Sequence, residues 1–84
     1  MSFEQIMLIP LLNKMTYHLN ILVELIDIEN RIVDITGFGK EELTSNATKA
    51  LEIIEQMEAE CRKVGCKVKF VVKDKKYSWS FVEA

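Results

Sequence analysis

The feature that most constrains this chain is a long segment whose apolar residues recur at helical spacing on two separate faces. At 100° per residue, the two seams are rotated from each other by roughly 100° or more. The first seam is Leu8, Leu12, Met15, Leu19, Leu22, Ile26 and Val33. The second is Leu11, His18, Ile21, Leu25, Ile28, Ile32 and Ile35. We therefore expect a helix over residues 11–36 whose apolar surface covers roughly 220° of its circumference, with a polar stripe that includes Asn13 and Asn20.

The beginning of this segment carries its own signals. Ser2 and Gln5 have the spacing of a capping box, so a helix can begin at Ser2. Pro10 would then lie inside that helix, and because proline lacks a backbone N–H we expect a kink or a break near residues 6–10.

The end of the segment has two interpretations. Gly37 can adopt the left-handed conformation that ends a helix, with Phe38 packing against Val33. The alternative is a hairpin within LIDIENRIVDIT that turns at Glu29-Asn30, but that dipeptide lacks the glycine that a two-residue turn prefers. The sequence leaves open whether residues 31–36 are helix or strand.

A second helix is expected to begin within KEELTSNATKA, where Thr44, Ser45 or Asn46 can cap it. Its end is predicted at Gly65 in a Schellman motif that folds Cys66 back onto Cys61. Its expected buried face is Ala47, Ala50, Leu51, Ile54, Met57, Cys61 and Val64.

The stretch KVKFVVKDKKYSWSF, residues 67–81, predicts a hairpin that turns at KDKK. This register pairs Val72 with Tyr77, Phe70 with Trp79, and Val68 with Phe81 on one face. The other face receives Lys67, Lys69, Val71, Ser78, Ser80 and Val82. Lysines and aromatic residues therefore lie on opposite sides, and we expect the aromatic side to pack on the helices.

Together these elements predict an α+β fold in a single domain over residues 1–84: a long N-terminal helix kinked near Pro10, a second helix and a C-terminal two-stranded antiparallel hairpin. A helix over residues 11–36 would be about 39 Å long, whereas a compact chain of this size is only about 30 Å across. Because a short helix and a hairpin cannot cover both seams, we expect a homodimer to complete the fold. The interface candidates are Leu12, Met15, Leu19, Leu22, Ile26, Ile21, Leu25, Ile28 and Ile32.

The net charge of −2 is unevenly distributed, because residues 1–60 carry −7 and residues 61–84 carry +5. The basic C-terminal part offers a set of candidate phosphate contacts for nucleic acid. They are Lys67, Lys69, Lys73, Lys75 and Lys76.

No combination of residues points to catalysis or to a cofactor. Cys61 and Cys66 have no second cysteine pair, and the single histidine, His18, lies far away, so a zinc site lacks ligands. We expect both thiols to be small core residues, with a redox-sensitive pair as the alternative. The chain is accordingly predicted to be no enzyme and to hold no metal or cofactor.

The N-terminal segment carries Glu4 and no early lysine or arginine, so it does not read as a secretion signal, and the chain is expected to be cytoplasmic without a membrane segment. These observations favour a small non-enzymatic protein-interaction or regulatory module that acts as a homodimer and binds a further protein of unknown identity. The alternative is a nucleic-acid-binding protein that uses the basic hairpin.

Overall fold

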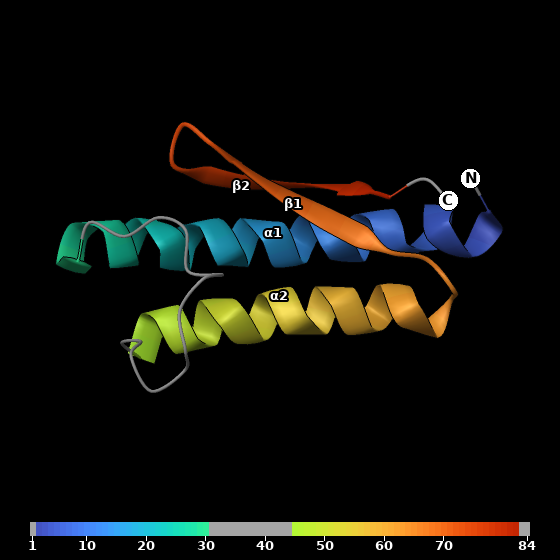
Figure 1. The fold of residues 1–84 in the computed structure, drawn as a ribbon, viewed down its shortest axis with the longest axis horizontal. Helices are drawn as coiled ribbons and strands as arrows, with labels where there is room; N and C mark the ends of the chain where they lie inside the picture. The colour runs from blue at the N-terminus through green and yellow to red at the C-terminus, as the bar shows by residue number, and fades with distance from the viewer. Residues whose placement is uncertain (1, 31–44, 83–84) are drawn as a thin grey trace.

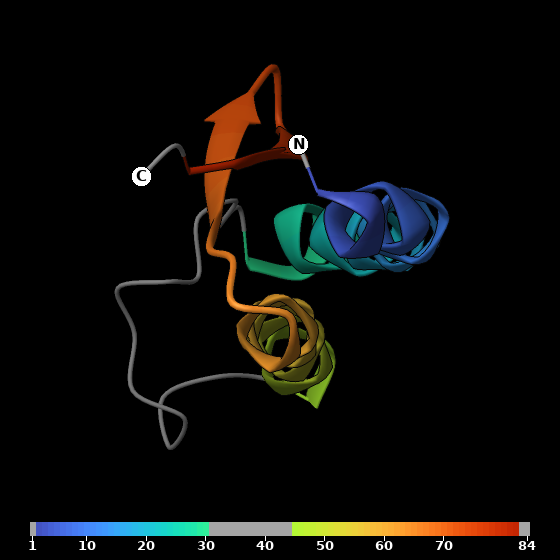
Figure 2. The ribbon, with the colours of Figure 1, turned by 90° about the vertical axis from the view of Figure 1, so that its right-hand side faces the viewer.

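The computed structural model describes residues 2–30 and 45–82. Helix α1 (Phe3–Asn30) is followed by α2 (Ser45–Lys63), strand β1 (Val68–Lys73) and strand β2 (Lys76–Phe81). The two helices lie side by side and antiparallel, and the hairpin packs across one side of the pair (Figures 1 and 2). The predicted α+β fold of two helices and an antiparallel hairpin is confirmed.

Helix α1 begins with the predicted capping box. The backbone N–H of Gln5 donates to Ser2 Oγ at 3.2 Å, and the backbone N–H of Ser2 donates to Gln5 Oε1 at 2.7 Å. The helix then runs through Pro10 without interruption, so the expected break near residues 6–10 does not occur. Pro10 is exposed and Ile6 is 51% exposed, so water can reach the Ile6 carbonyl that proline leaves without a donor.

At its other end α1 remains helical to Asn30, so the alternative hairpin turn at Glu29-Asn30 is wrong. The apolar residues keep their helical spacing through this segment, and this spacing outweighs the strand preference of its β-branched residues. The predicted cap at Gly37, with Phe38 against Val33, and the open question over residues 31–36 lie outside the described residues.

Helix α2 begins at Ser45, within the predicted capping segment, and ends in the predicted Schellman motif. Gly65 has a φ of 74°, its N–H donates to the Arg62 carbonyl at 3.1 Å, and the Cys66 N–H donates to the Cys61 carbonyl at 3.0 Å. This reversal directs the chain back along α2 and into β1.

Two buried clusters form the core between the helices and the hairpin. One cluster joins α1 to the first half of α2 and to β2 through Leu19, Val23, Ile26, Ala47, Ala50, Ile54 and Tyr77. The other lies toward the opposite end of the helix pair and consists of Leu12, Met57, Cys61 and Cys66. The predicted buried face of α2 is therefore confirmed, with only Leu51 and Val64 half-buried. Val23 of α1 is buried although it belonged to neither predicted seam.

The hairpin has the predicted register, with Val72 opposite Tyr77, Phe70 opposite Trp79 and Val68 opposite Phe81. Its two-residue turn consists of Asp74 and Lys75, whose φ angles are 53° and 62°. Positive φ at both positions is the geometry of a type I′ turn, which matches the twist of the strands. Aspartate is common at the first position of such a turn, whereas a lysine at the second position is strained.

Two asparagines of α1 attach the hairpin to the helix. The side-chain amide of Asn20 accepts a hydrogen bond from the Tyr77 backbone N–H at 2.7 Å and donates to the Tyr77 carbonyl at 3.0 Å. Two turns earlier, Asn13 accepts a hydrogen bond from Trp79 Nε1 at 2.9 Å. Part of the stripe assigned as polar from the sequence therefore faces β2, because an amide can satisfy the backbone edge of a strand that lacks a neighbour.

Replacing Lys75 by glycine should raise the free energy of unfolding by about 1 kcal/mol, because glycine adopts a positive φ without a Cβ penalty. Urea unfolding monitored by circular dichroism measures this change. The control Lys69→Gly, at an exposed strand position, should instead lower stability by roughly 0.5–1 kcal/mol. Equal losses in both variants would contradict the assigned turn.

Replacing Asn20 by alanine should lower the free energy of unfolding by about 2 kcal/mol or more, because it removes the two hydrogen bonds that join the Asn20 side chain to the Tyr77 backbone. Asn13→Ala serves as the control and should cost about 1 kcal/mol or less, since Asn13 is exposed and water can replace it. Chemical denaturation of both variants at the same ionic strength provides the comparison. Equal stability of the Asn20 variant and the unsubstituted chain would rule out this attachment.

Candidate interaction surface

Most of the exposed large apolar side chains of the described residues lie on α1. The exposed fractions of those on α1 range from 39% at Leu11 to 71% at Phe3. The set on this helix is Phe3, Ile6, Met7, Leu11, Tyr17, Ile21 and Leu25. The hairpin covers the helix pair on one side only, and no other described element covers α1 on these positions (Figure 2). The side of α1 that faces away from α2 and the hairpin is thus largely apolar and exposed.

Within this surface six residues recur at alternating steps of four and three, and we call them the open seam. The open seam is Met7, Leu11, Lys14, His18, Ile21 and Leu25. Alternating steps of three and four are the spacing with which one helix packs along another. The two polar members lie in the middle: Lys14 is exposed, and His18 is exposed with its ring edge-on to Tyr17 at 6.1 Å between centroids.

The predicted interface residues divide between the core and the surface. Leu12, Leu19 and Ile26 are 0%, 0% and 1% exposed within the single chain, so they contact its own α2 and hairpin and offer no surface to a second copy. Met15 and Leu22 are half-buried beside the same core clusters.

The remaining candidates are the exposed ones. Ile21 and Leu25 are 43% and 42% exposed, so both side chains are accessible to a second copy. Ile28 lies in the last turns of α1, but its side chain is outside the described part, as is all of Ile32. Exposed Phe3, Ile6 and Met7 were missing from the predicted interface, because that prediction began after Pro10; the continuous helix through Pro10 extends the apolar surface to Phe3.

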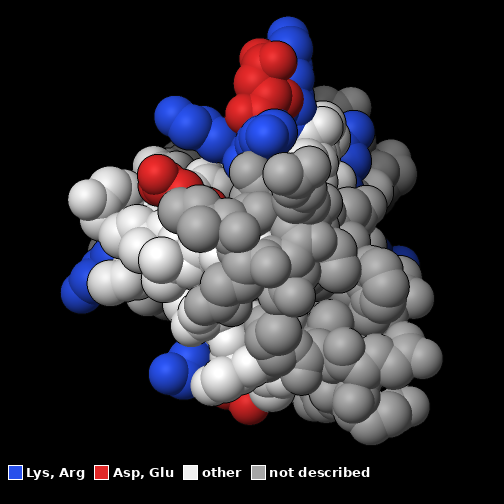
Figure 3. All heavy atoms as spheres, turned by 90° about the vertical axis from the view of Figure 1, so that its left-hand side faces the viewer, with Lys and Arg blue, Asp and Glu red and all other residues white. Residues whose placement is uncertain are grey.

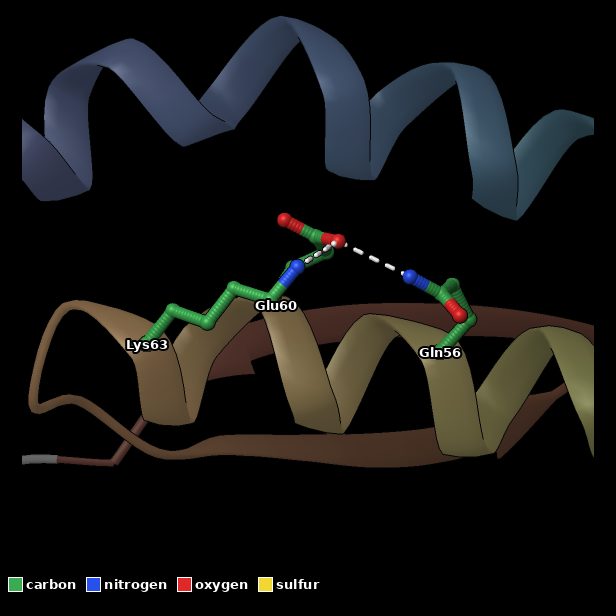
Figure 4. Close-up of polar contacts among 3 residues, drawn as sticks. All are labelled: Gln56, Glu60 and Lys63. Atoms are coloured by element: carbon green, nitrogen blue, oxygen red, sulfur yellow. Dashed lines mark hydrogen bonds and ion pairs between the residues drawn. The ribbon is translucent and has the colours of Figure 1, made fainter.

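Helix α2 carries a small polar network next to α1. Gln56 Nε2 donates to Glu60 Oε1 at 2.8 Å, and Lys63 Nζ contacts the same oxygen at 3.0 Å (Figure 4). The hydrogen bond from Lys63 is the main cause that lowers the pKa of Glu60. Figure 4 shows the Glu60 side chain pointing from α2 toward α1, with the hairpin behind the helices. The network therefore forms a charged border beside the apolar surface of α1.

The five lysines considered for nucleic acid are all exposed, but they occupy two separate places. Lys67 and Lys69 lie at the start of β1, whereas Lys73, Lys75 and Lys76 surround the turn. Asp74 lies among the turn lysines, and Figure 3 shows basic and acidic side chains gathered together over this end of the hairpin. The nucleic-acid alternative stays a prediction.

The aromatic residues of the hairpin are engaged on its other face. Trp79 and Phe81 form an edge-to-face pair at 5.0 Å, Phe70 and Tyr77 form another at 6.5 Å, and Tyr77 is only 3% exposed. The predicted separation of lysines from aromatics is confirmed. A base could therefore not stack on these rings while its phosphate contacts Lys67 or Lys69.

Both cysteines are free and buried, as expected of core residues. Cys66 Sγ lies 3.3 Å from the Cys61 carbonyl oxygen, toward which its thiol can donate. Burial, followed by the contact with Cys66, raises the pKa of Cys61 to about 11. Because this value exceeds the ordinary 9.0, the neutral thiol favours the folded state below about pH 9, and that contribution is lost as the pH rises through about 11.

Next to Cys66 lies a small surface hollow of about 220 Å³. Its lining is Glu58, Arg62, Cys66, Lys67 and Val68. Its charged groups are one acid, Glu58, and two bases, Arg62 and Lys67, so the lining carries both signs of charge. Among the described residues no group of three or more histidine, cysteine or acidic side chains could hold a metal ion.

Over Phe3–Ile26, α1 is long and apolar enough to cross a membrane by length and composition, a criterion that a core helix of a soluble protein and a signal sequence near the N-terminus also meet. Here α1 contributes Leu12, Leu19, Val23 and Ile26 to the packed core. The cytoplasmic location stays a prediction.

Searches of family models, curated proteins and solved structures returned no match to this chain.

In the native protein, thiol reagents should label Cys61 very slowly at pH 8. The side chain is 0% exposed, and with a pKa of about 11 only on the order of one thiol in a thousand is ionised. Iodoacetamide labelling followed by peptide mass spectrometry measures the rate. The denatured chain is the control and should react completely; equally fast labelling of the native chain would show that the thiol is accessible.

Proposed function

We propose that the chain is a small non-enzymatic protein-interaction module that acts as a homodimer through the exposed apolar side of α1. The observation that carries the proposal is the open seam: Leu11, Ile21 and Leu25 stay 39–43% exposed on a helix whose other side is fully packed. A helix that is apolar around most of its circumference is stable in water only when both sides are covered.

The size of the chain supports the same conclusion. A domain of 84 residues buries a smaller share of its surface than a larger one, so its core alone gives a narrow margin of stability. Covering apolar surface is worth about 25 cal/mol per Å². Soluble monomers rarely expose large apolar patches, and such patches mark interaction surfaces.

The composition of the exposed side favours protein over lipid. Lys14, His18 and Glu24 are all exposed among the apolar residues of α1. Charged groups near the middle of a membrane-spanning helix are costly, whereas a protein partner can supply opposite charges or leave them at a solvated border.

The double substitution Ile21→Asp and Leu25→Asp should convert a dimer into a monomer at low micromolar concentration. Each removed side chain is expected to contribute roughly 1.5–3 kcal/mol when buried, and each 1.4 kcal/mol changes the dissociation constant tenfold. Light scattering coupled to size exclusion, with analytical ultracentrifugation across a dilution series, gives the mass.

The matched control is Val71→Asp, which changes a 50% exposed apolar residue on the hairpin and should leave the dimer intact. Circular dichroism of each variant checks that α1 and the hairpin remain folded. A monomeric mass for the unsubstituted protein over the whole dilution series would refute the proposed homodimer.

A further inference from the structure

We propose that the open seam from Leu11 to Leu25 is covered by α1 of a second copy running antiparallel, in the register that places Lys14 beside Glu24 of the partner subunit. This inference rests on the proposed function and adds to it the orientation, the register and the residues that select them. Three observations carry it: the spacing of the open seam, the position of Lys14 within it, and the distance between Lys14 and Glu24.

The length and spacing of the open seam fit a second helix as the occupant. Met7 and Leu25 are the ends of the open seam, and the eighteen steps between them span about 27 Å of helix. Side chains of a neighbouring helix fit between residues at alternating steps of three and four. The second copy of α1 carries the same spacing.

The charges then decide the orientation. A parallel two-fold pair would place Lys14 against Lys14 of the partner subunit and His18 against His18 of the partner subunit. On its own helix, the positions one turn from Lys14 are Pro10, Leu11, Tyr17 and His18, none of which is acidic. Two lysines meeting within an apolar seam would repel each other without compensation, so the parallel pair is disfavoured. An antiparallel pair separates the two lysines toward opposite ends.

The register follows from the exposed acids of α1, Glu4 and Glu24, which are each ten positions from Lys14. Pairing Lys14 with Glu24 overlaps the two helices from residue 9 to Asn30, whereas pairing it with Glu4 would overlap only the first half of α1. When the two-fold axis passes beside the peptide between residues 19 and 20, His18 lies opposite Ile21 of the partner subunit and Lys14 lies opposite Leu25 of the partner subunit. The Lys14 ammonium then lies beside Glu24 of the partner subunit, which is exposed on the flank of the seam. The symmetry creates this contact twice.

Within one chain the same two residues cannot meet. Lys14 and Glu24 are ten positions apart on one continuous helix, which separates them by about 15 Å along its axis. Both are exposed, and neither is needed for the core clusters. Any energetic coupling between them therefore reports a contact between subunits.

This coupling supplies the test. Lys14→Glu and Glu24→Lys, each alone, should raise the dissociation constant of the homodimer about tenfold at low ionic strength, because each creates two like-charge contacts. The double variant, Lys14→Glu with Glu24→Lys, should return to within about threefold of the unsubstituted protein. Sedimentation equilibrium at 20 mM and 500 mM salt measures all three, and the effects should shrink at the higher salt.

Lys69→Glu is the control, since it reverses an exposed charge on the outer face of the hairpin and should leave the dissociation constant unchanged. Circular dichroism should show the same helix content in every variant. If the protein dimerises and the Ile21/Leu25 variant abolishes the dimer, but the charge reversals have no effect or the double variant is the weakest, the register proposed here is wrong while the proposed function stands. A monomeric unsubstituted protein overturns both.

Discussion

The structure depends on one constraint, which is that α1 is apolar around most of its circumference and must be covered from more than one direction. Helix α2 and the hairpin cover one arc, where Leu12, Leu19, Val23 and Ile26 are fully or almost fully buried. They are too few and too short to reach the arc that holds Ile21 and Leu25. The whole molecule measures 40 × 24 × 19 Å, so its longest dimension is essentially the length of this one helix.

The hairpin is stable because one face packs on the core, the other face is hydrated and one edge is hydrogen-bonded to α1. Its aromatic face completes the core through Tyr77, while Lys67 and Lys69 on the opposite face remain hydrated. An isolated two-stranded hairpin is marginal in water, so the contacts that bind it to α1 are needed. Asn20 supplies them by pairing with the backbone of Tyr77 much as a third strand would.

The features that the sequence predicted best are those whose partners lie within a few residues. The capping box at Ser2 and Gln5, the Schellman motif at Gly65 and the register of the hairpin depend on local geometry, and all three are present. Local spacing has few solutions for such motifs, so the residue types identify them.

Features that depend on packing between distant segments were harder to predict. Periodicity found two apolar seams on α1 but could not tell which one the chain's own α2 would cover, because both have the same spacing. For the same reason Leu12 and Leu19 were predicted at a subunit interface and lie in the core. Asn13 and Asn20 resembled solvated helix residues, since the residues of β2 that bind them, Trp79 and Tyr77, are more than fifty positions away in sequence.

The polar residues in the open seam bear on what kind of association such a surface supports. Lys14 and His18 interrupt the apolar residues at its centre, where a purely apolar seam would bind more tightly. Polar groups at such positions lower affinity but penalise partners and registers that leave them unpaired. Lys14 and His18, together with the acids that can reach them, therefore determine which of several equally apolar helices binds best. The apolar residues supply the driving force for association, and the charged residues restrict it to a partner of matching geometry.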